Sequence, residues 1–90
     1  QILGFIHVSM EDHLQQSLKK FESLVASSDQ ILECHALSGQ YDYLLKVVAR
    51  DMGHYEQFLT KSLLAGRGVA SANTSFVINE RKNATVLPLD

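Results

Sequence analysis

The feature that most constrains the fold is a pair of apolar segments separated by a tight turn near the middle of the chain. The segments 31–37 and 42–49 are rich in residues that favour strands, and Ser38-Gly39-Gln40-Tyr41 lies between them. Gly39 can take the positive φ that a hairpin turn needs. The sequence therefore predicts an antiparallel strand pair, and Asp51 directly after it is suited to cap a helix.

Before this pair, the sequence predicts one strand and one helix. Residues 3–8 are apolar and β-branched, as expected for a strand, and Ser9 with Asp12 resembles a weak capping box. The helix that follows breaks at residues 27–29, and its apolar residues recur at helical spacing: Leu14, Leu18, Phe21, Leu24 and Val25.

After the pair, the sequence predicts a second helix and a fourth strand. The helix ends at Gly66 and Gly68, and its apolar face consists of Met52, Tyr55, Phe58, Leu59 and Leu63. Residues 69–78 read as the fourth strand, and residues 79–86 as an extended tail that can pair with a sheet edge. The order βαββαβ predicts an α+β, ferredoxin-like sandwich: an antiparallel sheet with both helices on one face.

The opposite face of this sheet is expected to need a cover. A face that no helix covers should be polar in a monomer, yet the first and third strands are apolar on both sides. The simplest cover is the same face of a second copy across a two-fold axis. We expect a homodimer of stacked sheets in which Phe5, Tyr43, Leu45 and Val47 contact the partner.

Composition narrows the class of protein. The 90 residues make one small domain, and a net charge of −2 with scattered Lys and Arg argues against DNA binding by these residues. No apolar run approaches the ~20 residues that span a membrane. The single cysteine, Cys34, fits a reducing compartment, so we expect a cytoplasmic protein. The chain begins with Gln rather than Met, which favours a piece of a longer protein.

The central turn is the first candidate site. It can be only a good hairpin, with Gly39 for its φ angle and Asp42 for a local hydrogen bond. Alternatively, the amides around Gly39 can hold a carboxylate while Asp42 holds an ammonium. Those are the two charged groups of every free amino acid.

The fourth strand offers a second candidate in Asn73, Thr74 and Ser75. Three small polar residues fit an edge strand with a wetted face, or hydroxyls that line a pocket. Because neighbouring residues face opposite ways, the register decides whether Thr74 or Ser75 enters that pocket.

Metal and catalytic sites are less well supported. No His or Cys pair has zinc-ligand spacing, and Cys34 and His35 are adjacent, so they face opposite sides of a strand. An enzyme of the same fold could use His7 or His35 with Tyr43 as proton donor. There is no nucleophile elbow and no plausible acid pair, so we expect no catalysis, no metal and no cofactor.

The segment ECHALSGQYDYLLKVVARD, residues 33–51, resembles the effector domain of the Lrp/AsnC (feast/famine) transcriptional regulators, and the resemblance runs through nearly the whole chain. It implies a domain spanning residues 1–90 that binds a free amino acid between dimers and assembles into tetramers or octamers. The family's helix-turn-helix domain precedes this one and is not encoded here, so DNA would be bound only through that other part.

The resemblance also implies a set of site residues. In the family, the G-x-Y-D turn and a strand segment line the effector pocket, and their counterparts here are Gly39, Tyr41, Asp42, Tyr43, Thr74 and Ser75. Gln40 departs from the charged residue common at that position, so the identity of the effector does not follow. The alternatives are an oligomerisation module without a ligand and, after it, a small enzyme.

Overall fold

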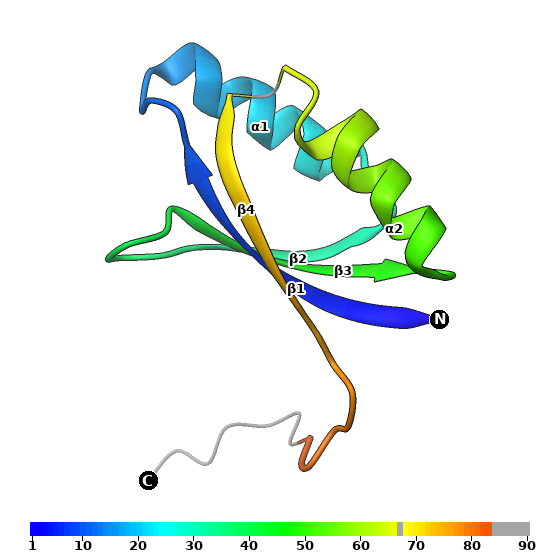
Figure 1. Cartoon of the computed structure of the whole chain (residues 1–90). Coiled ribbons are helices and arrows are strands. Elements are labelled where there is room, and N and C mark those ends of the chain that lie inside the picture. Colours follow the sequence, from blue (N-terminus) through cyan, green and yellow to red (C-terminus); the bar gives the residue numbers. More distant parts are fainter. Residues whose placement is uncertain (67, 84–90) are drawn as a thin grey trace, which may run out of the picture.

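The computed structural model describes residues 1–66 and 68–83. Its elements are β1 (Ile2–Met10), α1 (Gln15–Ser27), β2 (Ile31–Ala36), β3 (Tyr43–Ala49), α2 (Met52–Phe58), the π-helical turn η1 (Leu59–Leu63) and β4 (Val69–Phe76). The strands form one antiparallel sheet in the order β2-β3-β1-β4, with both helices over the same face (Figure 1). The predicted βαββαβ, ferredoxin-like arrangement is confirmed.

The sequence predicts the start of α2 correctly and the start of α1 wrongly. Asp51 caps α2 as predicted, since its Oδ1 accepts a hydrogen bond from the His54 amide at 2.8 Å. The capping box at Ser9 is wrong because β1 continues to Met10, so Ser9 is a strand residue. Instead, Asp12 Oδ1 accepts from the Leu14 amide at 3.0 Å, just before α1.

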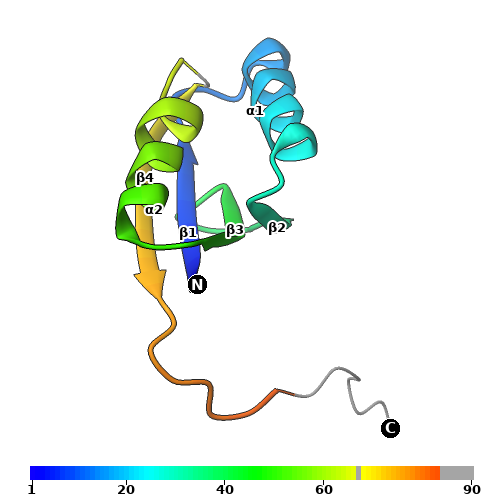
Figure 2. The same cartoon turned by 90° about the vertical axis from the view of Figure 1, so that its right-hand side faces the viewer.

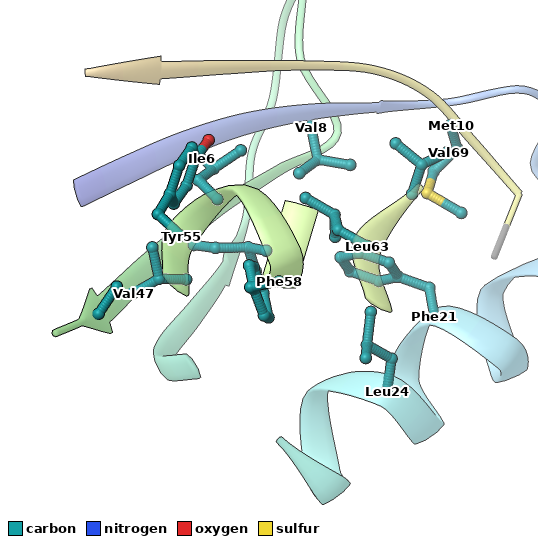
Figure 3. Close-up of a cluster of buried hydrophobic side chains, with 12 residues drawn as sticks. Ile6, Val8, Met10, Phe21, Leu24, Val47, Tyr55, Phe58, Leu63 and Val69 are labelled. Atoms are coloured by element: carbon teal, nitrogen blue, oxygen red, sulfur yellow. The ribbon is translucent and has the colours of Figure 1, made fainter. Parts of the chain in front are cut away.

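The core lies between the sheet and the two helices (Figure 3). Strands β1 and β3 contribute alternate residues to it, while α1 contributes Phe21 and Leu24. Leu14 and Met52, predicted on the apolar helix faces, are about half exposed because they stand at helix starts. The buried residues are Ile6, Val8, Met10, Phe21, Leu24, Leu45, Val47, Ala49, Tyr55, Phe58, Leu63 and Val69.

The register fixes which side of β3 is covered, and it corrects the predicted dimer contacts. Leu45 pairs with Ile6, and Val47 pairs with Gly4, on the helix-covered face. Leu45 is fully buried and Val47 is 2% exposed. Tyr43 lies on the same face, where its ring stacks on Phe21 with centroids 4.7 Å apart. The assignment of Tyr43, Leu45 and Val47 to a partner contact is therefore wrong.

The face without helices, which we call the open face, is lined by the other set of side chains. Phe5 lies there as predicted, with Leu3 beside it on β1 and Leu44 and Val48 on β3. These four residues are only half-buried in the single chain. Figure 2 shows this side of the sheet without a covering helix. The apolar second face expected from the sequence therefore exists, but with Leu44 and Val48 in place of Leu45 and Val47.

The chain leaves the sheet after β4. The Val77 amide donates to the Leu3 carbonyl at 2.8 Å, and Ile78 is 98% exposed. Residues 79–83 form no strand and run away from the sheet (Figure 1), so these residues do not pair with a sheet edge as the sequence suggested. The remainder of the predicted tail, residues 84–86, lies outside the described residues.

Candidate functional site

The β2–β3 loop, residues 37–42, is held against the C-terminal end of β1. The Asp42 amide donates to the Val8 carbonyl at 2.8 Å, and the Leu37 amide donates to the Asp42 carbonyl at 2.9 Å. Gly39 has φ of 107°, which confirms the predicted need for glycine at the turn. Among the described residues, no backbone hydrogen bond uses the amides of Gly39 and Gln40. The tip of the loop thus keeps amide donors for an acceptor outside the loop.

The Asp42 carboxylate is fixed in place by the end of β1. Its Oδ2 accepts a hydrogen bond from the Met10 amide at 2.7 Å, and its Oδ1 lies 2.9 Å from His13 Nε2. The Met10 amide, and after it the His13 side chain, hold the Asp42 pKa below its usual range. Asp42 is therefore an ionised carboxylate at neutral pH, anchored through one oxygen and 28% exposed.

Tyr41, the residue before Asp42, lies over the open face. Its ring is tilted over His7 with centroids 5.0 Å apart, and its hydroxyl accepts from Asn73 Nδ2 at 3.0 Å. His7 and Asn73 are register partners on β1 and β4. The β2–β3 loop, β1 and the edge strand β4 therefore meet at one end of the open face.

The structure brings together only part of the predicted site. Gly39, Tyr41 and Asp42 share the loop, and Ser75 lies on the same open face, opposite Phe5 in the register. Thr74 faces the other way, where its hydroxyl is hydrogen-bonded to the Tyr55 hydroxyl.

Tyr43 also belongs to the helix-covered face, so the ring seen against Phe21 cannot reach the loop cluster. Tyr43 and Thr74 are separated from the loop by the sheet itself. Of the two hydroxyls that the sequence left open, the register therefore favours Ser75 for a site on the open face.

Three side chains at this end of the sheet were not among the predicted ligand residues. His13, considered from the sequence only among the histidines for a metal site, lies between β1 and α1. It contacts Asp42 just beyond the end of β1, which runs two residues further than predicted. From the sequence, His7 is considered as a catalytic base and, with the other histidines, for a metal site, and Asn73 as one of several small polar residues. The β1–β4 register is what brings Asn73 to His7, and that register was not predicted.

A cleft of about 330 Å³ lies on the helix-covered face between α1 and the strands β2 and β3. Burial raises the Cys34 pKa, so this thiol is protonated at neutral pH and is a poor nucleophile. The cleft is lined by Phe21, Glu22, Val25, Ala26, Cys34, Ala36 and Tyr43.

The geometry also tests the enzyme and metal alternatives. His7 and His35 point to the open face and Tyr43 to the other, so the acid–base pair considered from the sequence does not meet. Within residues 1–66 and 68–83, no three His, Cys, Asp or Glu side chains form a cluster that could hold a metal ion. Of the helices in that part of the chain, none is both long and apolar enough to cross a membrane.

The sequence matches the model of the Lrp/AsnC ligand binding domain over residues 3–87. It is 32% identical over 85 residues to the Bkd operon transcriptional regulator of Pseudomonas aeruginosa, covering 94% of this chain and 56% of that protein. It is 34% identical over 86 residues to the leucine-responsive regulatory protein of Klebsiella pneumoniae, covering 96% of this chain and 52% of that protein. The chain thus spans about half the length of these relatives, which are transcriptional regulators and not enzymes.

Solved structures agree with the sequence match. A transcriptional regulator from Neisseria meningitidis in complex with L-Met has a TM-score of 0.91 and 36% identity, over 99% of this chain and 57% of that chain. An AsnC family transcriptional regulator from Agrobacterium tumefaciens has a TM-score of 0.83 and 27% identity, over 98% of this chain and 57% of that chain.

Proposed function

The chain belongs to the Lrp/AsnC ligand binding domain family, and from that premise we propose that it binds a free amino acid where the β2–β3 loop meets β1. The observation that carries the proposal is the Asp42 carboxylate, which is ionised, partly exposed and held by the Met10 amide at 2.7 Å. A fixed carboxylate in the same loop as amides that no other backbone group uses matches the two charges of an amino acid.

Each end of the ligand has a partner in this arrangement. Asp42 accepts from the ammonium, and the amides around Gly39 donate to the carboxylate. Tyr41 lies at the same end of the open face, and Ser75 lies further along that face, opposite Phe5; both would contact the remainder of the ligand. Tyr43 and Thr74 shape the site only from behind the sheet, through the packing of β3 and β4.

The ligand that we propose to test first is L-methionine. The Neisseria regulator, which is 36% identical to this chain, forms a complex with L-Met. An apolar side chain also suits this end of the open face, where Leu44 is the register partner of His7 under the Tyr41 ring. The leucine-responsive relatives make L-leucine the next candidate.

We further propose that the open face is covered by the same face of a second copy. The half-buried apolar side chains of Leu3, Phe5, Leu44 and Val48 are the core of that contact. Dimers would then assemble into tetramers or octamers, and a ligand that prefers one arrangement would shift the population towards it.

DNA binding is placed outside residues 1–90, which form a single effector-binding and oligomerisation domain in this proposal. The net charge of −2 and the scattered basic residues argue against binding of the DNA backbone by these residues. In a complete regulator of this type, we propose that a helix-turn-helix domain preceding these residues responds to assembly, in the cytoplasm. The second candidate function is an oligomerisation module without a ligand, favoured by the same apolar open face.

The test uses three related compounds against the purified 90-residue chain. L-Methionine is expected to raise the melting temperature by roughly ten degrees or more at about a hundred times its dissociation constant, equivalent to ~2.7 kcal/mol. N-Acetyl-L-methionine lacks the ammonium, and L-methioninol lacks the carboxylate. Each is expected to lose most of that effect, and L-methionine is expected to lose it on the Asp42→Asn variant.

Asp29→Asn is the matched control, because Asp29 is an exposed carboxylate in the loop after α1, away from Asp42. If L-methionine and the other common amino acids all left the melting temperature unchanged, the oligomerisation module would be the better assignment. If N-acetyl-L-methionine bound as well as L-methionine, Asp42 would not be the ammonium partner.

A further inference from the structure

His13 occupies the carboxylate oxygen that a ligand's ammonium would use. One oxygen of Asp42, Oδ2, is bound to the Met10 amide at 2.7 Å. The other, Oδ1, lies 2.9 Å from Nε2 of His13. The His13 side chain is 70% exposed, and within residues 1–66 and 68–83 its side-chain hydrogen bond is the one to Asp42.

The charged groups around His13 all favour its protonated form. Asp42 from the β2–β3 loop acts on it through the hydrogen bond and through charge, and Asp12 acts on it from its own loop through charge. The Asp12 carboxylate is itself hydrogen-bonded to the Leu14 amide at 3.0 Å. An imidazolium at Oδ1 is a cation in the place where the proposed site must receive another cation.

We infer that His13 is a proton-controlled competitor for Asp42, which weakens amino-acid binding when it is protonated and releases the carboxylate when it is neutral. This inference rests on the proposed function, and it adds a pH dependence and a residue that controls it. His13 is a regulatory residue of the site in this account, because it acts on the ligand through Asp42.

The direction of the pH dependence follows from proton linkage. In the chain without a ligand, the hydrogen bond to Asp42 and the negative charge of Asp42 raise the His13 pKa. A ligand ammonium on Asp42 removes that partner and adds a positive charge nearby, which lowers the His13 pKa. The bound state then holds fewer protons, so affinity rises with pH, by at most tenfold per pH unit between the two pKa values.

The experiment is a titration of L-methionine into the 90-residue chain by calorimetry, at half-unit steps from pH 5.5 to 8.0. The wild-type dissociation constant is expected to fall as pH rises and to level off above the His13 pKa. His13→Gln should bind with nearly constant affinity across the range, and more tightly than wild type at pH 5.5. His13→Lys, which keeps a positive charge at every pH, should bind weakly throughout.

His54→Gln is the matched control. His54 accepts a hydrogen bond from the Arg50 amide at 3.0 Å at the start of α2. The start of α2 and the β2–β3 loop lie at opposite ends of β3 (Figure 1). This variant should keep the wild-type pH profile. The His7 ring lies 5.0 Å from the Tyr41 ring at the same site, and His7→Gln should also keep the wild-type dependence of affinity on pH.

The outcomes separate the inference from the proposed function. If L-methionine binds but the wild-type and His13→Gln profiles coincide, His13 is not the competitor and the proposed site stands. If the pH dependence of the dissociation constant disappears in His7→Gln and not in His13→Gln, the controlling group is His7, which would also overturn the inference. Absence of L-methionine binding by every variant at every pH would overturn the proposed site together with the inference.

A second measurement reports on the contact directly. The imidazole of His13, followed by NMR, should have a pKa above the ordinary histidine value without L-methionine and a lower pKa with it. A His13 titration that L-methionine leaves unchanged would show that ligand and imidazole do not share Asp42.

Discussion

Two neighbouring leucines on β3 provide a sharp test of the fold, because they differ only in the face on which they lie. Leu45 is fully buried opposite Ile6, whereas Leu44 is half-buried on the open face opposite His7. Truncating Leu45 to Ala removes a core side chain and leaves a cavity beneath the helices. Such changes cost about 3 kcal/mol, and a domain of this size loses roughly 4–8 degrees of melting temperature for each kcal/mol.

Leu45→Ala is therefore expected to melt about 15 degrees below wild type, while its oligomeric mass at a temperature where it is folded stays the same. Leu44→Ala removes a side chain that solvent already reaches in the single chain, so its direct cost there should be below about 1 kcal/mol. Its main effect is expected on association, because Leu44 lies in the proposed contact between two copies.

The assay combines thermal unfolding with light scattering after gel filtration, at several protein concentrations. Only Leu44→Ala should dissociate more readily on dilution, and its loss of stability should depend on concentration. The opposite pattern, with Leu45→Ala dissociating and keeping its melting temperature, would refute the register that places Leu45 in the core. An unchanged mass for both variants would refute the open face as the contact between copies.

Three further predictions concern single side chains. Asp51→Ala removes the acceptor for the His54 amide, 2.8 Å away, and should cost about 1 kcal/mol in urea unfolding. Gly39→Ala forces a side chain onto a residue with φ of 107° and should cost more than about 1 kcal/mol, although an added Cβ would meet no atom within 4 Å. The third concerns Asp42, whose pKa is lowered in the folded chain. The ionised carboxylate therefore stabilises the fold fully above the ordinary carboxyl pKa of about 4, and this stabilisation is lost as the pH falls through the lowered pKa. Asp42→Asn should therefore melt below wild type at pH 7 and level with it near pH 2, and a difference that persists in acid would contradict a stabilising role for the ionised carboxylate.

The element order could be read from the sequence because each signal is local. The helical spacing of Leu18, Phe21 and Leu24 predicts α1, and the predicted cap at Asp51 is present in the structure. The start of α1 was misplaced because the signals at Ser9 and Asp12 are weak, while the pairing of β1 with β4 carries the strand on to Met10. Long-range pairing of this kind overrides a local capping preference.

The facing of β3 could not be read in the same way. Tyr43, Leu45 and Val47 alternate with Leu44 and Val48, and both sets are apolar. The alternation therefore shows which residues share a face, but not which set lies on the helix-covered face. The side is decided by the partner strand, where Gly4, Ile6 and Val8 lie opposite Val47, Leu45 and Tyr43. Thr74 and Ser75 present the same problem on β4, and the same register resolves it.

The position of the loop cluster relative to the open face gives the proposed coupling a physical basis. His7, under the Tyr41 ring, is the register partner of Leu44 on one side and of Asn73 on the other. A ligand on Asp42 that moved Tyr41 would therefore act on the strands that carry the proposed contact between copies. No separate relay is needed, because the site and the contact share one face and neighbouring residues. Ligand affinity and association should then be linked, so a Leu44 variant that weakens association should also change the affinity for L-methionine. The affinities of the associated and the dissociated chain should differ by the same factor by which L-methionine changes association. Independent values for the two would show that the shared face does not couple them.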